Sequence, residues 1–244
     1  EKTLMVCVMY VNNETGIIQP IKEIAEMAHR NGSLFFCDAT QAVGKIPINV
    51  TELGIDVMAF SAHKFYGPKG IGALYISSKL KKNLQSQIQG GGQQFNLRSG
   101  TLNVPGIIAM GKAAEIAMEE MQENTIQIEK LRNDLESALL EIPEVYVNGD
   151  INKRIYNTTN LCFKGVNSEQ MILSLGTICV SSGSACNATT SKPSHVLQAM
   201  EMNDSDALSS IRFSLGKFNT KSDIETAVEK IKKIVTRLRE VSIT

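Results

Sequence analysis

The sequence lacks the features that mark several classes of protein. No apolar run approaches the roughly 18 residues that a membrane-spanning helix needs, and the first residues contain no basic stretch followed by a hydrophobic one. The 25 basic and 25 acidic residues cancel to a formal net charge of +0. No electrostatic feature therefore favours nucleic acid or an anionic membrane as a partner, and we expect the protein to bind neither.

Cysteine is also sparse. The five cysteines, an odd number spread over 244 residues, do not resemble the dense disulfide framework of a small secreted domain. A reducing compartment fits better: the cytoplasm, or the mitochondrial matrix if the source is eukaryotic. The chain also has no initiator methionine and enters an apolar run at residues 4–11 almost at once. From this we expect a fragment whose beginning is missing.

The residues that are present predict an α/β fold. With 43% hydrophobic and 20% charged residues, the chain can bury a core of one large domain or two smaller ones. In the first third, apolar runs alternate with a helical pattern that begins after Pro20 and ends at Gly32, which indicates a mostly parallel sheet with a crossover helix. The predicted strands are 4–11, 34–37, 56–60 and 71–76, and the predicted helix is 20–31.

The second half has a different pattern. An apolar stripe over residues 104–140 predicts a long surface helix or two abutting ones. Short strands and helices follow, which is typical of a smaller α+β domain. We expect a large domain at 1–120 and a small domain at 121–244, with the boundary inside the long helix. The predicted strands are 145–148, 156–163 and 177–180, and the predicted helices are 168–175, 194–200 and 222–240.

Polar residues gather where the predicted strands end. Ligands of parallel sheets bind beyond the carboxyl ends of the strands, so these residues are candidates for one site. They are Asn12, Asn13, Asp38, Gln41, Ser61, His63 and Lys64.

Lys64 and Asp38 together suggest a pyridoxal phosphate site. A lysine at the tip of an apolar strand can form a Schiff base with the cofactor's aldehyde, and an aspartate can keep the pyridine nitrogen protonated. Ser61 and His63 can donate hydrogen bonds to a phosphate. The alternative is that Lys64 is a solvated strand end and Asp38 a turn or N-cap residue.

Cys186 is a candidate nucleophile. It lies in a run of small polar residues, 181–192, between a predicted strand and a predicted helix, where a thiol is exposed. The other cysteines lie in apolar strand runs, and we expect them to be small buried hydrophobes; they are Cys7, Cys37, Cys162 and Cys179. Zinc binding by Cys179, Cys186 and His195 is not favoured, because a Cys-x-x-Cys pair and a fourth ligand are missing. We expect no metal site.

Two further segments have chemistry of their own. The glycine-rich stretch 89–101 contains Arg98, Ser99 and Thr101, which give it an anion-binding capacity that a simple linker does not need. Arg212 falls inside an apolar strand, where a guanidinium must find a partner. The partner is either the carboxylate of an amino-acid ligand or an acidic side chain of the protein itself.

Taken together, these residues resemble the cysteine desulfurases, pyridoxal-phosphate enzymes with the class V aminotransferase fold. The long loop around Cys186 resembles the branch that supplies iron–sulfur cluster assembly. The chain departs from the usual pattern at Tyr10 and Thr15, and the N-terminal part of the family is absent. The matching segments, in the family's order, are 11–16, 38–41, 61–64, 98–103, 182–186 and 211–213.

The resemblance implies a role for each residue. Lys64 would hold the cofactor, Asp38 the pyridine nitrogen and Gln41 the phenolic oxygen, whereas Ser61 and His63 would bind the phosphate. Thr101 would contact the phosphate of a neighbouring subunit in a homodimer, and Asn13 the cofactor or substrate. Arg212 would bind the carboxylate of L-cysteine, and Cys186 would take its sulfur as a persulfide. Cys186 could also be a transient iron–sulfur ligand.

The implied activity converts L-cysteine to L-alanine and passes sulfur to iron–sulfur scaffold and other acceptor proteins. The implied fold is that of the aspartate aminotransferase-like, pyridoxal-phosphate-dependent transferases. Two alternatives stay open. The chain could be another class V enzyme, such as an aminotransferase or a selenocysteine lyase, in which Cys186 is incidental. It could also be an inactive fragment that acts only as a binding partner.

Overall fold

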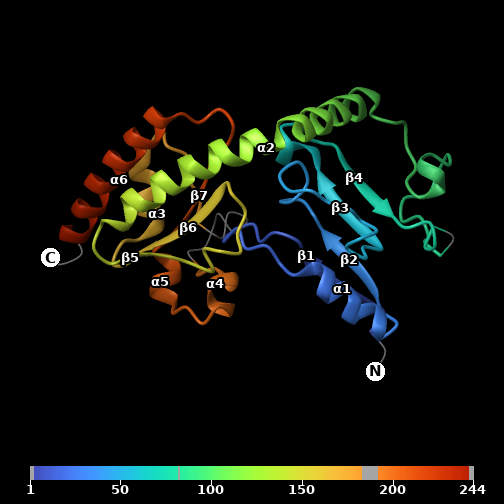
Figure 1. Ribbon diagram of the computed structural model, residues 1–244, viewed down its shortest axis with the longest axis horizontal. Coiled ribbons are helices and arrows are strands. Elements are labelled where there is room, and N and C mark those ends of the chain that lie inside the picture. The colour runs from blue at the N-terminus through green and yellow to red at the C-terminus, as the bar shows by residue number, and fades with distance from the viewer. Residues whose placement is uncertain (1–2, 82, 183–191, 242–244) are drawn as a thin grey trace. The chain divides into compact units, whose positions relative to one another are not determined.

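The computed structural model describes residues 3–81, 83–182 and 192–241. The chain forms two compact units (Figure 1). The first comprises Glu1–Val11 and Gln19–Met121, and the second comprises Asn12–Ile18 and Gln122–Thr244. A short early segment therefore belongs to the unit that the second half of the chain builds. No helix in the described residues is long and apolar enough to cross a membrane.

The first unit is built on a four-stranded sheet. Its strands β1 (Met5–Met9), β2 (Leu34–Asp38), β3 (Val57–Ser61) and β4 (Gly72–Ile76) lie in that order. The first three are parallel and β4 pairs antiparallel with β3. The prediction of a mostly parallel α/β sheet is therefore confirmed.

Helix α1 (Ile21–Arg30) joins β1 to β2 and packs against β2. Its buried residues Ile21, Ala25 and Ala28 recur at helical spacing, so one stripe faces the sheet. The chain leaves the helix through Gly32, whose φ of +72° is left-handed and favours glycine.

The second unit contains a three-stranded antiparallel sheet. Its strands are β5 (Val145–Val147), β6 (Thr158–Phe163) and β7 (Ser210–Ser214), in the order β5-β6-β7. Its helices are α3 (Ser168–Leu175), α4 (His195–Ala199), α5 (Asp204–Leu208) and α6 (Lys221–Val241). Figure 1 shows α3, α6 and the second half of α2 on this sheet.

Strand β6 is buried along its whole length because both faces of the sheet are covered. Leu161 and Phe163 belong to the core that includes α2, α3 and α6. Between them, Cys162 points to the opposite face and donates to the carbonyl of Asp206 in α5 at 3.4 Å. Alternate residues of a strand point to opposite faces, so both faces of β6 are packed. Its polar residues Thr158, Thr159 and Asn160 are buried together with the apolar ones.

Helix α2 (Val104–Leu140) is one continuous helix rather than two abutting ones. Its first part belongs to the first unit and its remainder, from Gln122, to the second. Residues at helical spacing in the second part enter the core of that unit, whereas Ile108 and Met118 in the first part are exposed. The core residues of α2 are Ile128, Leu131, Leu135 and Leu139.

One predicted strand is wrong. Residues 177–180 form no strand, and only Ser181 pairs with Arg212 as an isolated antiparallel bridge. The reason lies in the end of α3, where the Ile178 amide still bonds the Leu175 carbonyl at 3.3 Å, so the chain reaches the sheet late.

The five-residue helix α5 was not predicted, because it is too short to show helical periodicity.

Two cysteines predicted to be buried are exposed. Cys7 lies on β1 on the same face as Met9, which is also exposed, and Cys179 lies in the segment that forms no strand. Cys37 and Cys162 are buried, as predicted. An apolar run fixes the period of a strand but not which face a neighbouring element covers.

A buried ionic cluster stabilises the second unit. The terminal nitrogens Nη1 and Nη2 of Arg154 donate to the Glu136 carboxylate, at 2.6 and 2.7 Å, and the Thr159 hydroxyl donates to it as well. Arg132 donates to the Ile155 carbonyl at 3.3 Å. Burial raises the pKa of Glu136, but the hydrogen bonds from Arg154 and Thr159 and the two arginine charges outweigh it, so the net pKa is lowered.

Replacing this carboxylate should destabilise the protein strongly. Glu136→Gln leaves the buried guanidinium of Arg154 without its counter-ion, so we expect the free energy of unfolding to fall by about 3 kcal/mol in urea titrations at pH 7. Because the folded-state pKa lies below the ordinary 4.5, the stabilisation is present above that value and disappears as the pH falls through the folded-state pKa.

The acid-induced loss of stability should therefore be smaller in Glu136→Gln than in the unsubstituted protein. Glu141→Gln is the control, because Glu141 pairs with Lys232 on the surface and should have little effect. Equal destabilisation by the two variants would contradict the role given to burial.

Candidate active site

The candidate site of the first unit begins at the carboxyl ends of two neighbouring strands. Asp38 ends β2, and Ser61 ends β3. The register pairs Asp38 with Ala59, two residues before Ser61. Because β2 and β3 are parallel, both polar ends lie at the same edge of the sheet, where ligands of such sheets bind.

A short 3₁₀ turn, Ala62–Phe65, follows β3 and exposes Lys64. Ala62 and Phe65 are buried, at 0% and 2% exposure, whereas His63 and Lys64 between them are exposed. In a 3₁₀ turn residues i and i+3 lie on the same side, so anchoring the first and last residues turns the middle two outward. The local sequence therefore presents an imidazole and an ammonium group to solvent.

The end of this turn needs glycine. Tyr66 is left-handed, with φ of 67°, and the Gly67 amide bonds the Ala62 carbonyl at 2.9 Å. A Cβ at Gly67 would lie 2.8 Å from the Cβ of Ala62. The close return of the chain fixes the turn that holds Lys64.

Lys64 is chemically available in the described part of the chain. Within residues 3–81, 83–182 and 192–241 its ammonium has no hydrogen bond or ion pair, and the same holds for the His63 ring and the Ser61 hydroxyl. The Asp38 carboxylate accepts one bond, from the Thr40 amide at 2.9 Å. These groups can therefore all receive a ligand.

Cys37, next to Asp38, is not a competing nucleophile. Burial, and then the charge of Asp38, raise the pKa of its thiol to about 12. The thiolate is the reactive form, so Cys37 is inert near neutral pH.

The turn after β2 packs against the turn after β3. A Cβ on Gly44 would lie 2.5 Å from the Cβ of Phe65, and Gly44 has φ of +75°. Only a residue without a side chain allows this approach. In the same turn, Lys45 donates to the side-chain oxygen of Gln41 at 3.1 Å. The contact holds Gln41 and Lys64 on adjoining turns.

A second group of predicted residues lies in the second unit. Arg212 of β7 donates from Nη1 to the Asn13 carbonyl at 2.7 Å. Its Nε is buried and has no hydrogen-bond partner among the described residues. Burial lowers the pKa of Arg212, and the charge of Glu14 acts in the opposite direction. The guanidinium thus has donors left for an anion.

Glu14 is a buried acidic residue that the sequence did not single out. It is 4% exposed and accepts a hydrogen bond from the hydroxyl of Ser194, which caps α4. Its backbone is held by Asn12, whose side-chain oxygen accepts from the Glu14 and Thr15 amides at 2.8 and 2.9 Å. The Asn-x-Glu-Thr-Gly pattern of this turn is the one signal that could have pointed to it.

The remaining predicted residues are placed as follows. Thr101 is exposed in the segment before α2, and the side chain of Asn13 is exposed. Cys186 lies outside the described residues, in 183–191. Within the described ranges, no group of three or more His, Cys, Asp or Glu residues could hold a metal ion.

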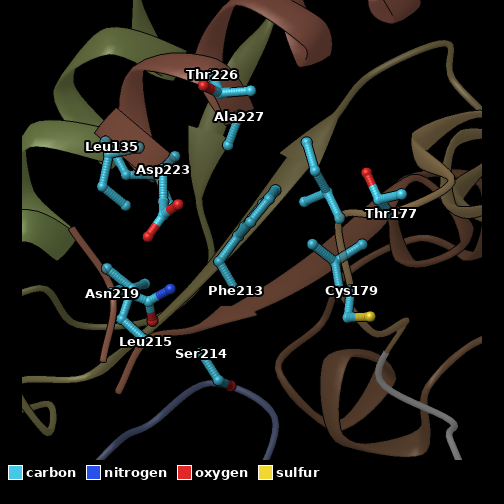
Figure 2. Close-up of a pocket in the computed structure, with 13 residues that line it drawn as sticks. Leu135, Thr177, Cys179, Phe213, Ser214, Leu215, Asn219, Asp223, Thr226 and Ala227 are labelled. Carbon is cyan, nitrogen blue, oxygen red and sulfur yellow. The ribbon is translucent and has the colours of Figure 1, made fainter. Parts of the chain in front are cut away.

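The second unit also has a cavity of about 410 Å³ between β7, α6 and residues 177–180. Figure 2 shows Phe213 between Asn219 and Asp223 on one side and Thr177 and Cys179 on the other. None of the residues predicted for the site lines it.

The first unit thus combines a mostly parallel sheet with an exposed lysine in the turn after β3. Residues 1–226 match the family described as Aminotransferase class-V, and the chain belongs to this family. Enzymes of this family depend on pyridoxal 5′-phosphate.

Several relatives are cysteine desulfurases by name. The cysteine desulfurase IscS of Edwardsiella ictaluri is 47% identical over 99% of this chain and 60% of its own length, and that of Pectobacterium atrosepticum has the same identity and coverage. The chain thus spans about 60% of the curated relatives it matches.

Solved structures of similar proteins have the same fold. The NifS-like protein from Rickettsia africae has a TM-score of 0.87 and is 36% identical, over 96% of this chain and 62% of that protein. The structure described as SspA in complex with cysteine has a TM-score of 0.69 and is 32% identical, over 89% of this chain and 60% of that one. The predicted α/β fold of the pyridoxal-phosphate-dependent transferases is confirmed.

The packing of Gly44 on Phe65 can be tested by substitution. We expect Gly44→Ala to lower the free energy of unfolding by about 1–2 kcal/mol, because alanine is strained in the left-handed conformation. Overpacking of the added Cβ against Phe65 should lower it by about 1–3 kcal/mol more. Gly32→Ala is the matched control, because its φ is +72° but no atom lies within 4 Å of the added Cβ. The stability measured by urea unfolding and the affinity for pyridoxal phosphate should both fall more in Gly44→Ala than in Gly32→Ala. Equal losses in the two variants would refute the contact between Gly44 and Phe65.

Proposed function

We propose that the protein is a pyridoxal-phosphate-dependent cysteine desulfurase, which converts L-cysteine to L-alanine and takes the sulfur as a persulfide on Cys186. The observation that carries the proposal is Lys64, which is exposed and has no hydrogen bond or ion pair among the described residues, in the turn after β3 at the edge where Asp38 ends β2. Relatives at 47% identity that carry the name cysteine desulfurase support the choice of reaction.

The donor set of the first unit fits the cofactor group by group. Lys64 supplies an amine for the aldehyde carbon, and Asp38 a carboxylate for the protonated pyridine nitrogen. Ser61 and His63 supply a hydroxyl and an imidazole for the phosphate, and Gln41 an amide for the phenolic oxygen. Each chemical feature of the cofactor thus has a matching side chain at one edge of one sheet.

When bound, pyridoxal phosphate supplies an electron sink for the carbon atoms of an amino acid. The protein's residues do the rest of the work. Asp38 keeps a proton on the pyridine nitrogen, and the Nζ of Lys64 is the amine that moves protons at the substrate's carbon atoms. The rigid strand ends suit these tasks, because both require fixed geometry.

Arg212 is the proposed carboxylate site. Its buried Nε, which has no hydrogen-bond partner in the described part of the chain, and its planar fork of donors match the carboxylate of L-cysteine. Of its two sequence-based alternatives, the structural ion pair is weaker: Glu14 bonds Ser194, and the described contact of Arg212 is to the carbonyl of Asn13. The exposed Asn13 side chain is left for cofactor or substrate.

Cys186 is the proposed sulfur acceptor. Its thiolate attacks the sulfur of the substrate, so that a sulfur–sulfur bond forms while the carbon–sulfur bond breaks, and the carbon gains a proton to give alanine. Thiol and cysteine together hold the same atoms as persulfide and alanine, so no external oxidant or reductant is required. The persulfide sulfur can then pass to a second thiol.

The wider assignments follow the same proposal. Iron–sulfur scaffold proteins and other sulfur acceptors are the expected partners, and Cys186 is a candidate for a transient iron–sulfur ligand. The protein is expected to act as a cytoplasmic homodimer in which the exposed Thr101 reaches the phosphate bound by the neighbouring subunit.

Replacing the acceptor thiol should abolish sulfur transfer. With L-cysteine as substrate, Cys186→Ser should form less than about one hundredth of the alanine and protein-bound sulfane sulfur, because a serine hydroxyl cannot form a persulfide. Cys179→Ser is the matched control, since Cys179 is another exposed thiol close in sequence, and it should keep both products. Normal yields of both products from Cys186→Ser would reject Cys186 as the sulfur acceptor, whereas a turnover of other substrates that survives the loss of Cys186 would favour an aminotransferase or a selenocysteine lyase.

Replacing the cofactor lysine separates an enzyme from a non-catalytic binding partner. The protein mixed with pyridoxal phosphate should develop a visible absorption band, and Lys64→Ala should lose it because no amine remains to bind the aldehyde. Lys69→Ala, an exposed lysine that follows the same turn, should retain the band. If the unsubstituted protein shows no band, an inactive fragment is the better description.

A further inference from the structure

Lys45 holds the side chain of Gln41 in one orientation. Its ammonium nitrogen lies 3.1 Å from the Gln41 side-chain oxygen and 3.1 Å from the Gln41 carbonyl. Both residues are half-buried in the turn after β2. This turn also contains Gly44, whose packing on Phe65 joins it to the turn that exposes Lys64.

The chemistry of lysine decides which end of the amide faces it. An ammonium group has three donors and no acceptor, so only the amide oxygen of Gln41 can bond it. The Gln41 nitrogen must then point away from Lys45, with two N–H donors to offer. Without such a partner, the two ends of a glutamine amide are nearly equivalent in shape, and either can face a ligand.

We propose that Lys45 is a positioning residue, which makes Gln41 an obligatory hydrogen-bond donor toward the phenolic oxygen of the cofactor. The inference rests on the proposed function, in which Gln41 faces that oxygen. A donor at this oxygen stabilises its negative charge, whereas an amide turned the other way would place an oxygen against it. The ammonium charge also polarises the amide and strengthens the N–H donor.

A purely structural role for Lys45 makes a different prediction. Its bond to the Gln41 carbonyl could simply tie the turn together, and its loss would then lower stability without changing the cofactor's electronic state. The absorption spectrum of the bound cofactor distinguishes the two roles. The phenolic oxygen of the cofactor and the nitrogen of Lys64 would share a proton. If the donor to this oxygen is weaker, the oxygen holds that proton more tightly, so the visible band should titrate at higher pH.

The experiment compares Lys45→Met, Lys45→Arg and Lys22→Met in the protein loaded with pyridoxal phosphate. Lys45→Met keeps the length of the chain but has no donor. We expect its visible band to titrate about half a pH unit higher and its cofactor to dissociate about fivefold more readily. Lys45→Arg, which has donors only, should resemble the unsubstituted protein, and so should Lys22→Met on the exposed face of α1.

A second background shows whether Lys45 acts through Gln41. In Gln41→Met, adding Lys45→Met should leave the titration midpoint unchanged, because the amide that transmits the effect is gone. A through-space effect of the lost charge would persist in this background and would overturn the proposal. Asp38, His63 and Lys64 are the same in every variant, so differences in the midpoint report on the Lys45–Gln41 pair.

The outcomes separate this proposal from the function on which it rests. A normal band that Lys45→Met does not shift overturns the role of Lys45 and leaves the proposed function standing. Absence of a band in the unsubstituted protein overturns both. If Lys45→Met does not fold, Lys45→Gln is titrated in its place: its side-chain oxygen admits the flipped amide, so an unshifted midpoint overturns the proposal.

Discussion

The candidate site depends on the burial of Ala62 and Phe65 at the two ends of one turn. These residues fix a 3₁₀ turn directly after β3, and the residues between them, His63 and Lys64, have no direction left but outward. Gly44 of the preceding turn also packs closely against Phe65, so one buried side chain fixes the positions of two turns. Packing of apolar groups thus places the polar ones, because a core is too densely filled to allow a second arrangement.

In the second unit a buried ion pair, rather than apolar packing, fixes the segment that carries a candidate residue. Residues 12–18 leave the first sheet after β1 and join the second unit, where the Gly16 carbonyl accepts the Ile155 amide at 2.9 Å. Arg154, next to Ile155, is fixed by the buried carboxylate of Glu136. The buried ion pair therefore holds the segment that brings Asn13 to Arg212, and the desolvation cost of its charges is offset by multiple hydrogen bonds.

Much of the fold could be predicted because its signals are local. The apolar runs predicted β2 and β3, and the strand ends then located Asp38 and Ser61 on one edge of the sheet. The wrong predictions concern burial, which depends on elements that are distant in the sequence and cover a strand or leave it exposed. The exposed Cys7 and Cys179 lie in apolar runs like those of the buried Cys37 and Cys162, and only their neighbours in space differ. The hydrogen bond from Lys45 to Gln41 was likewise invisible, since spacing alone does not say which side chains turn toward each other.

The sequence by itself determined the fold class and the set of chemically competent side chains. Hydrophobic period and the residues at strand ends are properties of short segments, and they persist whatever surrounds them. Tertiary structure alone decided which of these groups are free to act. Burial makes Cys37 inert and leaves the Nε of Arg212 unpaired among the described residues, because desolvation depends on neighbours far away in the chain. The hydrogen bond from Lys45 orients the Gln41 amide, and although the two residues are only four apart, the conformation of the turn decides whether their side chains meet.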